Sequence, residues 1–101
     1  MTVGSSTVST IKAGRAADAI AMSKKWEQFL GGLGAQNVRS LLLMSTTPMQ
    51  VVLTFESENN ATFGALADKM MADPAFVPLM HDVNSEDSPV ASSVTACWVE
   101  V

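Results

Sequence analysis

The stretch from Val38 to Glu56 carries the clearest pattern of hydrophobic and polar positions in the chain. It holds two short apolar runs, VRSLLLMS and MQVVLTFE, separated by TTP. Both runs are too short for a globular helix of usual length and are bounded by polar residues, so they predict an antiparallel hairpin. Neither run alternates, because Leu41 to Leu43 and Val51 to Leu53 are consecutive apolar residues. Since successive side chains of a strand point to opposite faces, the pattern indicates a sheet that is apolar on both faces.

A sheet that is apolar on both faces needs a cover on each of them. We expect helices of the same chain on one face and a second copy of the protein on the other. The composition agrees, because 48% of the 101 residues are hydrophobic and only 16% are charged, against about 25% in an average soluble domain. A single domain of this size, residues 1–101, leaves roughly 5,500 Å² exposed, so oligomerisation is a natural way to bury more.

The N-terminal part of the chain predicts a strand followed by a long helix. Residues Thr7 to Lys12 are rich in β-branched side chains and indicate the strand. From Ala16 to Leu33 the sequence is rich in alanine and free of proline, and the glycines from Gly31 to Gly34 are typical of a helix end. Apolar residues fall on one stripe of this helix, namely Ala19, Met22, Trp26, Phe29, Leu30 and Leu33.

The C-terminal part predicts a second helical region and a last strand. Asn59 or Asn60 is placed to cap the helix, and Asp73-Pro74 is expected to restart it, with Asp as the N-cap and Pro at the first helical position. Residues 82–89 form a polar, acidic loop, and residues 94–101 indicate the closing strand. The expected buried stripe comprises Phe63, Leu66, Ala67, Met70 and Met71, continued by Phe76, Leu79 and Met80.

The resulting order, β-α-β-β-α-β, is the ferredoxin-like α+β plan with an antiparallel sheet. The residues Asp73-Pro74-Ala75-Phe76, followed by PLM, and the opening KAGRAADAIAM resemble segments of dimeric α+β barrel proteins, and NIPSNAP-like proteins and the antibiotic-biosynthesis-monooxygenase group are the most similar families. The resemblance runs over nearly the whole chain. It implies a homodimer joined through the sheet faces, with a pocket between each sheet and its helices.

Within that superfamily the known activities are varied. Some members are cofactor-free monooxygenases, others are isomerases, dehydratases or cyclases, some bind haem, and many have no assigned activity. Several rely on a positioned His, Tyr, Asn or Trp. This chain has no tyrosine and one histidine, so the resemblance indicates a fold and a habit of dimerising rather than one reaction.

Composition and motifs argue against several classes of function. A net charge of −4 with six scattered cationic residues disfavours nucleic acid as a partner. A single cysteine, Cys97, allows no disulfide within the chain and favours a reducing compartment. We see neither a signal peptide nor a membrane-length apolar window, so we expect a cytoplasmic protein. One Cys and one His provide no structural zinc set, no phosphate-binding glycine loop is present, and we expect no cofactor.

Two kinds of residue are candidates for a site. His81 is the only side chain that ordinarily titrates near neutral pH, which makes it the default general base, and the alternative, which is the commoner case, is a surface histidine at a helix end. Trp26 and Trp98 either stack on an aromatic or lipophilic ligand or belong to the core or a dimer interface.

Further candidates are apolar or cationic. The methionines, Met22 and Met70 among them, suggest a pliable lining for lipophilic ligands, or else fill gaps in a small core. Arg15 and Arg39 either orient an anionic ligand or pair with surface acids. Cys97 is expected to be a small buried hydrophobic residue, because no nearby basic sequence would activate it.

These observations leave two hypotheses for function. The first is a homodimer that binds a small lipophilic or aromatic molecule between sheet and helices, with His81 or Trp26 as the polar contact, and that acts as a cofactor-independent monooxygenase or an isomerase- or cyclase-type enzyme. The second is a non-catalytic dimerisation or interaction module with a filled core. The interior separates them, because a cavity with polar groups favours the first.

Overall fold

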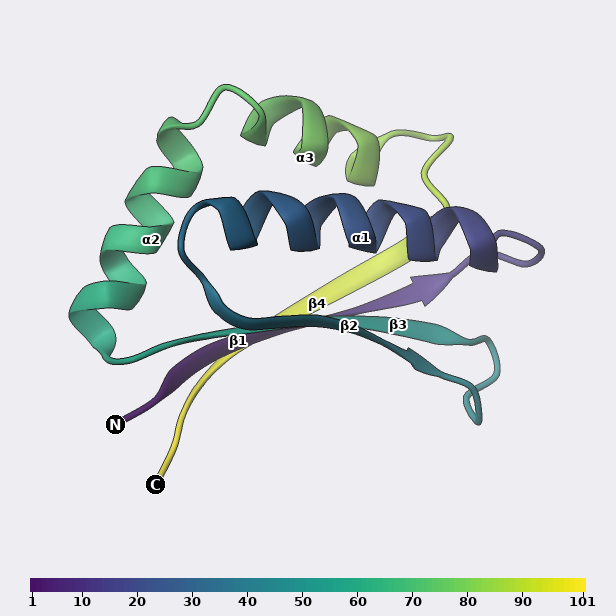
Figure 1. The fold of residues 1–101 in the computed structure, drawn as a ribbon. Helices are drawn as coiled ribbons and strands as arrows, with labels where there is room; N and C mark the ends of the chain where they lie inside the picture. Colours follow the sequence, from purple (N-terminus) through teal and green to yellow (C-terminus); the bar gives the residue numbers. More distant parts are fainter.

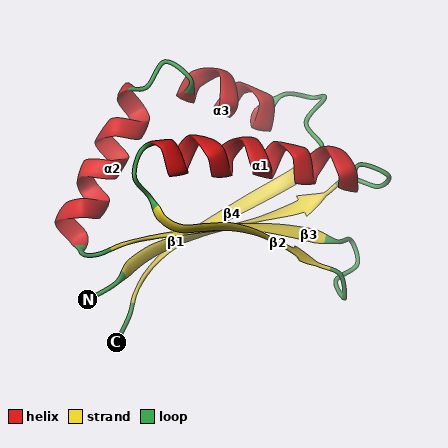
Figure 2. Ribbon diagram, in the orientation of Figure 1, coloured by secondary structure: helices red, strands yellow, loops and turns green.

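The computed structural model describes all 101 residues as two layers, one of strands and one of helices (Figure 1). Four antiparallel strands form one sheet in the order β2-β3-β1-β4. All three helices cover the same face of this sheet (Figure 2). The elements are β1 (Val3–Ile11), α1 (Ala16–Gly32), β2 (Gln36–Leu43), β3 (Gln50–Ser57), α2 (Asn60–Ala72), α3 (Phe76–Asn84) and β4 (Val90–Val99).

This arrangement confirms the ferredoxin-like α+β class, with one difference in the second helical region. The region is divided into α2 and α3, so the order is β-α-β-β-α-α-β. The first and the last strand of the chain are longer than the sequence indicated. Strand β1 begins at Val3 rather than Thr7 because its first residues pair with the end of β3 and with the end of β4.

The helix ends follow from local hydrogen bonding. Helix α1 ends at Gly32, and Gly34 takes a φ of +97°, a conformation that glycine adopts without a Cβ clash. At the start of α2, Asn59 is the N-cap and its side-chain oxygen accepts from the backbone N–H of Thr62 at 2.9 Å. This bond satisfies one of the free N–H groups that every helix start leaves.

The expected role of Asp73 as the N-cap of a restarted helix is wrong. Asp73 is extended (φ −75°, ψ 130°), as the residue before a proline prefers, and it ends α2. Its Oδ1 accepts from the N–H of Ala75 at 2.9 Å, which forms a turn, and α3 begins only at Phe76. Pro74 therefore separates two helices instead of opening the second one.

The buried core of the chain is small, with 14 of 101 residues buried. One apolar cluster, formed by Ile11, Ala19, Val51 and Val90, lies where β1, β3 and β4 meet α1. Leu30 is 2% exposed and anchors α1, whereas Met71, expected in the buried stripe of α2, is 70% exposed. The surface of 6102 Å² exceeds by several hundred Å² the roughly 5,500 Å² expected for this mass.

The face of the sheet without helices, called the bare face below, carries a row of apolar side chains across all four strands. The registers place Leu41 beside Val52, Val52 beside Val8, and Val8 beside Val94. Leu41 is 44% and Val94 70% exposed. By contrast, the neighbouring pair Leu42 and Val51 belongs to the helix side, so the prediction of a hairpin with two apolar faces is confirmed.

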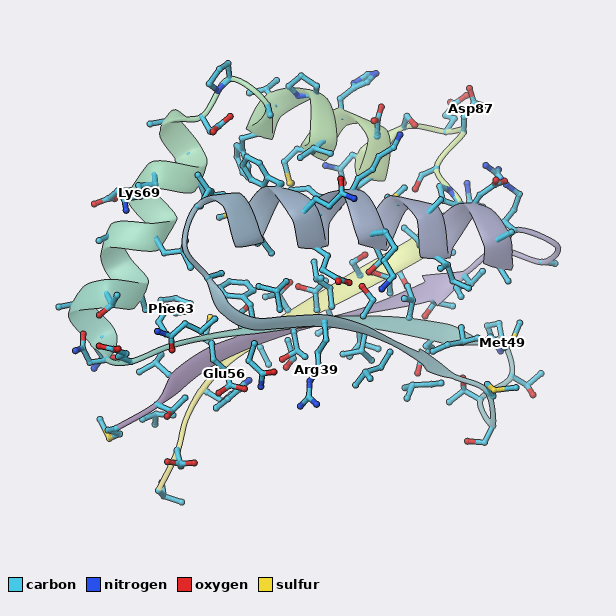
Figure 3. The ribbon with its side chains drawn as sticks, viewed as in Figure 1. Arg39, Met49, Glu56, Phe63, Lys69 and Asp87 are labelled. Carbon is cyan, nitrogen blue, oxygen red and sulfur yellow. The ribbon has the colours of Figure 1, made fainter.

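Figure 3 shows the side chains of Arg39 and Glu56 on the bare face, pointing away from the helices. Strand β4 forms one edge of the sheet, and its residues from Ala91 to Val99 are exposed. None of the three helices combines the length and the hydropathy that crossing a membrane requires.

Candidate functional site

A cavity of about 450 Å³ lies between the sheet and the helix layer. Its floor is formed by β1, β3 and β4, and its walls and roof by all three helices. Of the 23 residues that line it, 16 are hydrophobic. Proteins bind small organic molecules in cavities of roughly 300–1,000 Å³, so the space is sufficient for a ligand.

Aromatic rings form much of the wall. Trp26 of α1 meets Phe76 of α3 edge to face, with ring centroids 6.2 Å apart and an angle of 86° between the planes. Across the cavity, Phe55 of β3 and Phe63 of α2 are nearly parallel, with centroids 5.9 Å apart. Figure 3 shows Phe63 reaching from α2 toward the sheet. Such pairs give a wall of fixed shape, because edge-to-face and offset-parallel contacts are the preferred geometries of aromatic rings.

The floor of the cavity is polar along β1 and β4. Ser5, Thr7 and Ser9 point into it from β1, since they share the helix side of the sheet with Phe55, Leu53 and Val51. Their partners on β4 are Cys97, Thr95 and Ser93, which also line the cavity. The lining contains no Asp, Glu, Lys, Arg or His, so it offers hydroxyl groups, an indole, the thiol of Cys97 and one amide, that of Asn84.

A chain of hydrogen bonds between α1 and β2 holds the carboxylate of Glu27, which does not line the cavity. Ser40 Oγ donates its proton to Glu27 Oε2 at 2.9 Å. Because a hydroxyl group has only one proton, Ser40 must accept in its second hydrogen bond, and Ser23 Oγ donates to it at 2.7 Å. Lys24 Nζ also donates to Glu27, at 3.2 Å. The hydrogen bond from Ser40, followed by that from Lys24, lowers the pKa of Glu27 below its ordinary value. Glu27 is therefore kept as a carboxylate between α1 and β2, and Ser23 is the only member of this chain of hydrogen bonds that lines the cavity.

Three of the predicted ligand-binding residues come together in the cavity. Met22 and Trp26 line it from α1, and Met70 lines it from α2. All three are partly buried. The structure thus places the predicted methionine and tryptophan side chains around one space, joined there by Met80 of α3.

Trp98 does not line the cavity. It lies on the bare face, where its indole ring covers Gly4 and its Nε1 donates to Ser6 Oγ at 3.2 Å. The cavity is on the other face of the sheet, so Trp98 does not contact a ligand there.

Arg15 and His81 also lie away from the cavity. Arg15 forms an ion pair with Asp18 at 2.7 Å and donates to the backbone oxygen of Asp87 at 3.2 Å. It borders a separate polar hollow between α1 and α3. His81, in the last turn of α3, is exposed and borders neither space. Arg39, on the bare face, has no ion-pair partner.

Cys97 was expected to be a buried hydrophobic residue, and that expectation is wrong. The residue is exposed because β4 is an edge strand with no neighbour beyond it, and its side chain lines the open side of the cavity.

The residues of the polar floor were not recognised from the sequence as a site. A signal is nevertheless present, because small polar residues recur at every second position in Ser5, Thr7, Ser9 and again in Ser93, Thr95, Cys97. In a strand, that spacing places them on one face. No set of three or more His, Cys, Asp and Glu side chains is grouped to hold a metal ion.

Comparison with known proteins identifies solved structures that share this fold. No protein-family model matches the chain, and no curated protein matches it in sequence. An uncharacterised NIPSNAP domain protein from Burkholderia xenovorans superposes with a TM-score of 0.75 at 17% identity, covering 100% of this chain and 95% of that one. A NIPSNAP family protein from Agrobacterium tumefaciens gives a TM-score of 0.72 at 12% identity, covering 99% and 86%.

A third structure is that of a variant of SnoaB, a cofactor-independent oxygenase from Streptomyces nogalater. It has a TM-score of 0.69 at 16% identity and covers 98% of this chain and 92% of that one. Antibiotic-biosynthesis-monooxygenase-like structures match as well. The expected similarity to NIPSNAP and antibiotic-biosynthesis-monooxygenase-like proteins is thereby confirmed for the ferredoxin-like fold.

Proposed function

We propose that this protein is a homodimer that binds a small lipophilic or aromatic molecule in the cavity between its sheet and its helices. The cavity itself carries the proposal, because an open space of about 450 Å³ with 16 hydrophobic residues in its lining is the feature that a filled core lacks. It therefore supports the ligand-binding hypothesis over the alternative, a non-catalytic dimerisation module.

The lining determines which chemistry is compatible with the site. It holds no carboxylate, histidine, lysine or tyrosine, so apart from the thiol of Cys97 a general base would have to come from the substrate or from water. What the chain supplies is orientation of the ligand by Trp26 and the aromatic wall, together with exclusion of water. Cofactor-independent oxygenation and isomerase- or cyclase-type reactions, in which the substrate carries the reactive group, fit such a site. The cofactor-independent oxygenase among the structures of the same fold is consistent with this proposal.

The bare face is the proposed surface for the second copy. Its apolar row, formed by Leu41, Val52, Val8 and Val94, crosses the whole sheet, and Trp98 lies on the same face. A standard interface buries about 800 Å² on each partner. The accessible surface of one chain, 6102 Å², exceeds the roughly 5,500 Å² expected for its mass. The excess is of the same order as the area of such an interface, and a second copy on the bare face would bury it.

Filling the cavity from α2 tests the binding proposal. Ala67 lines the cavity, so Ala67→Phe places a ring inside it, whereas Ala65 on the same helix is exposed and Ala65→Phe serves as the matched control. Binding of the uncharged probe N-phenyl-1-naphthylamine is measured by fluorescence. We expect saturable binding to the unmodified protein and to Ala65→Phe, and a loss of at least about tenfold in affinity, or 1.4 kcal/mol, in Ala67→Phe.

Two results would argue against ligand binding in the cavity. Equal affinity of the probe for Ala67→Phe and Ala65→Phe would place the probe outside the cavity. No binding of the probe to any of the proteins would favour the dimerisation module. Native mass spectrometry of the purified protein adds an independent observation, because a retained small molecule appears there as an adduct on the oligomer.

A further inference from the structure

The polar floor of the cavity has a regular order that the apolar walls do not have. Two hydroxyl pairs join β1 to β4, namely Thr7 with Thr95 and Ser9 with Ser93. Together they are called the hydroxyl ladder below, and each pair is called a rung. Their side-chain oxygens are 2.8 Å and 2.7 Å apart, so each pair shares one hydrogen bond. All four side chains line the cavity.

Each rung of the ladder has hydrogen-bonding capacity left over. Two hydroxyl groups carry two protons, and the bond between them uses one. The second proton and the remaining lone pairs are left to bond to a ligand or to water. If a purely hydrocarbon ligand covered the ladder and excluded water, each unused donor would lose its partner, which is unfavourable for a buried hydroxyl. A ligand with oxygen atoms at these positions would meet both rungs.

The spacing of the rungs is set by the strand itself. Thr7 and Ser9 are two residues apart on one face, as are Ser93 and Thr95, which corresponds to about 6.8 Å along an antiparallel strand. A ligand that engages both rungs therefore needs two oxygens separated by roughly this distance along one edge. The opposite side of the cavity, with Met22, Met70 and Phe76, suits an apolar edge.

The same lining argues against a charged ligand. No ionisable side chain other than Cys97 borders the cavity, and Glu27 is bound to Ser40 and Lys24 outside it. A carboxylate or ammonium group that entered would lose its hydration without gaining an opposite charge. Hydroxyl groups compensate a neutral carbonyl or hydroxyl oxygen much better than they compensate a full charge.

We propose that the cavity selects uncharged aromatic or lipophilic molecules that carry hydroxyl or carbonyl oxygens along one edge, and that the hydroxyl ladder receives these oxygens. This inference rests on the proposed ligand-binding function and adds the class of ligand. The ladder then has two roles, since it also joins the edge strand to the rest of the sheet.

The test compares naphthalene-2,7-diol, which carries two hydroxyls on one edge, with naphthalene and with the anion naphthalene-2-carboxylate. Binding is measured by calorimetry on the unmodified protein and on Thr7→Val/Thr95→Val, which removes one rung and keeps side-chain shape. We expect the diol to bind most tightly to the unmodified protein and to lose about tenfold in affinity in the variant. Affinity for naphthalene should stay the same or rise.

Two further variants keep the test decisive. Thr54→Val removes an equivalent hydroxyl contact, since Ser6 Oγ donates to Thr54 Oγ1 at 3.1 Å, but on the bare face, so binding of the diol should not change. Ser93→Ala removes half of the other rung at an exposed position and replaces the double variant if that one does not fold.

The outcomes separate this inference from the function on which it rests. If the diol and naphthalene bind equally and the ladder variants alter neither, or if the carboxylate binds as tightly as the diol, the ladder does not select the ligand, although the cavity still binds one. If none of the aromatic compounds binds any of the proteins, ligand binding in the cavity fails as well.

Discussion

The contact between Gly4 and Trp98 on the bare face allows a quantitative prediction. A Cβ at residue 4 would overlap three atoms of the indole ring, the farthest of them at 2.6 Å, so in Gly4→Ala the ring must move. The movement breaks the hydrogen bond from Trp98 Nε1 to Ser6, at a cost of about 1 kcal/mol. Exposing roughly 50 Å² of ring surface costs about 1.3 kcal/mol more. Alanine regains about 0.5–1 kcal/mol, because glycine is unfavourable inside a strand, which leaves a net destabilisation of about 1.5 kcal/mol.

Urea unfolding followed by circular dichroism measures this change. Protein concentration is held constant, because the stability of the proposed dimer depends on it. In a Trp98→Ala background the same Gly4→Ala change should instead stabilise the protein by about 0.5–1 kcal/mol, which gives a coupling of about 2 kcal/mol between the two positions. Gly64→Ala in α2 is the control, since a Cβ there meets nothing within 4 Å and alanine is the better helix former. If Gly4→Ala destabilised the protein by the same free energy in the unmodified and in the Trp98→Ala background, the indole ring would not be the cause, and the reasoning would be refuted.

Two further predictions concern the interface and the acid range. Val94→Glu should give a monomer in native mass spectrometry, whereas Val77→Glu on α3, a valine equally exposed at 71% against 70%, should stay dimeric; a dimer in both cases would contradict the proposed interface. Because the folded pKa of Glu27 is lowered from 4.5, its carboxylate stabilises the protein above that pH, and the contribution is lost as the pH falls through the lowered value. Ser40→Ala should therefore reduce the thermal midpoint at pH 7 and weaken its decline below pH 4.5, and an unchanged profile would show that the bond contributes nothing.

The predictable part of the fold came from patterns that tertiary structure could not easily change. Two consecutive apolar runs in a hairpin must present side chains on both sides, and the structure has Leu42 toward the helices and Leu41 away from them. The apolar residues of α1 were equally informative. Their helical spacing places Ala19, Trp26 and Leu30 on one face of the helix, and only that face can be turned toward the sheet.

The side of the sheet to which Trp98 points was not available from the sequence. Strand β4 is apolar in both phases, and a shift of one residue exchanges its two faces. Only the pairing of Trp98 with Gly4 assigns the indole to the bare face. For the same reason the sequence did not show that Ser93 and Thr95 face the cavity.

The contacts of the charged residues were predictable only in part, because the ion pair of Arg15 was one of two alternatives that the sequence left open. Arg15 lies near the mouth of α1 in sequence, but Asp18 on the next turn and the backbone of Asp87 hold its guanidinium outside the cavity. Glu27 lies on a polar position of α1, and it accepts a hydrogen bond from Ser40 of β2. Such polar contacts depend on distances between elements, which hydrophobic periodicity does not specify.

The exposed edge strand β4 has a consequence for how the protein behaves in concentrated or partly unfolded states. Its ten residues, VASSVTACWV, contain no charge and no proline, and an edge of this kind is a template on which further strands assemble. Pro89 before it and Glu100 after it are the nearest residues that oppose such growth. The strand that supplies half of the hydroxyl ladder is thus also the segment where aggregation would begin, and changes made there to alter ligand binding will alter solubility too.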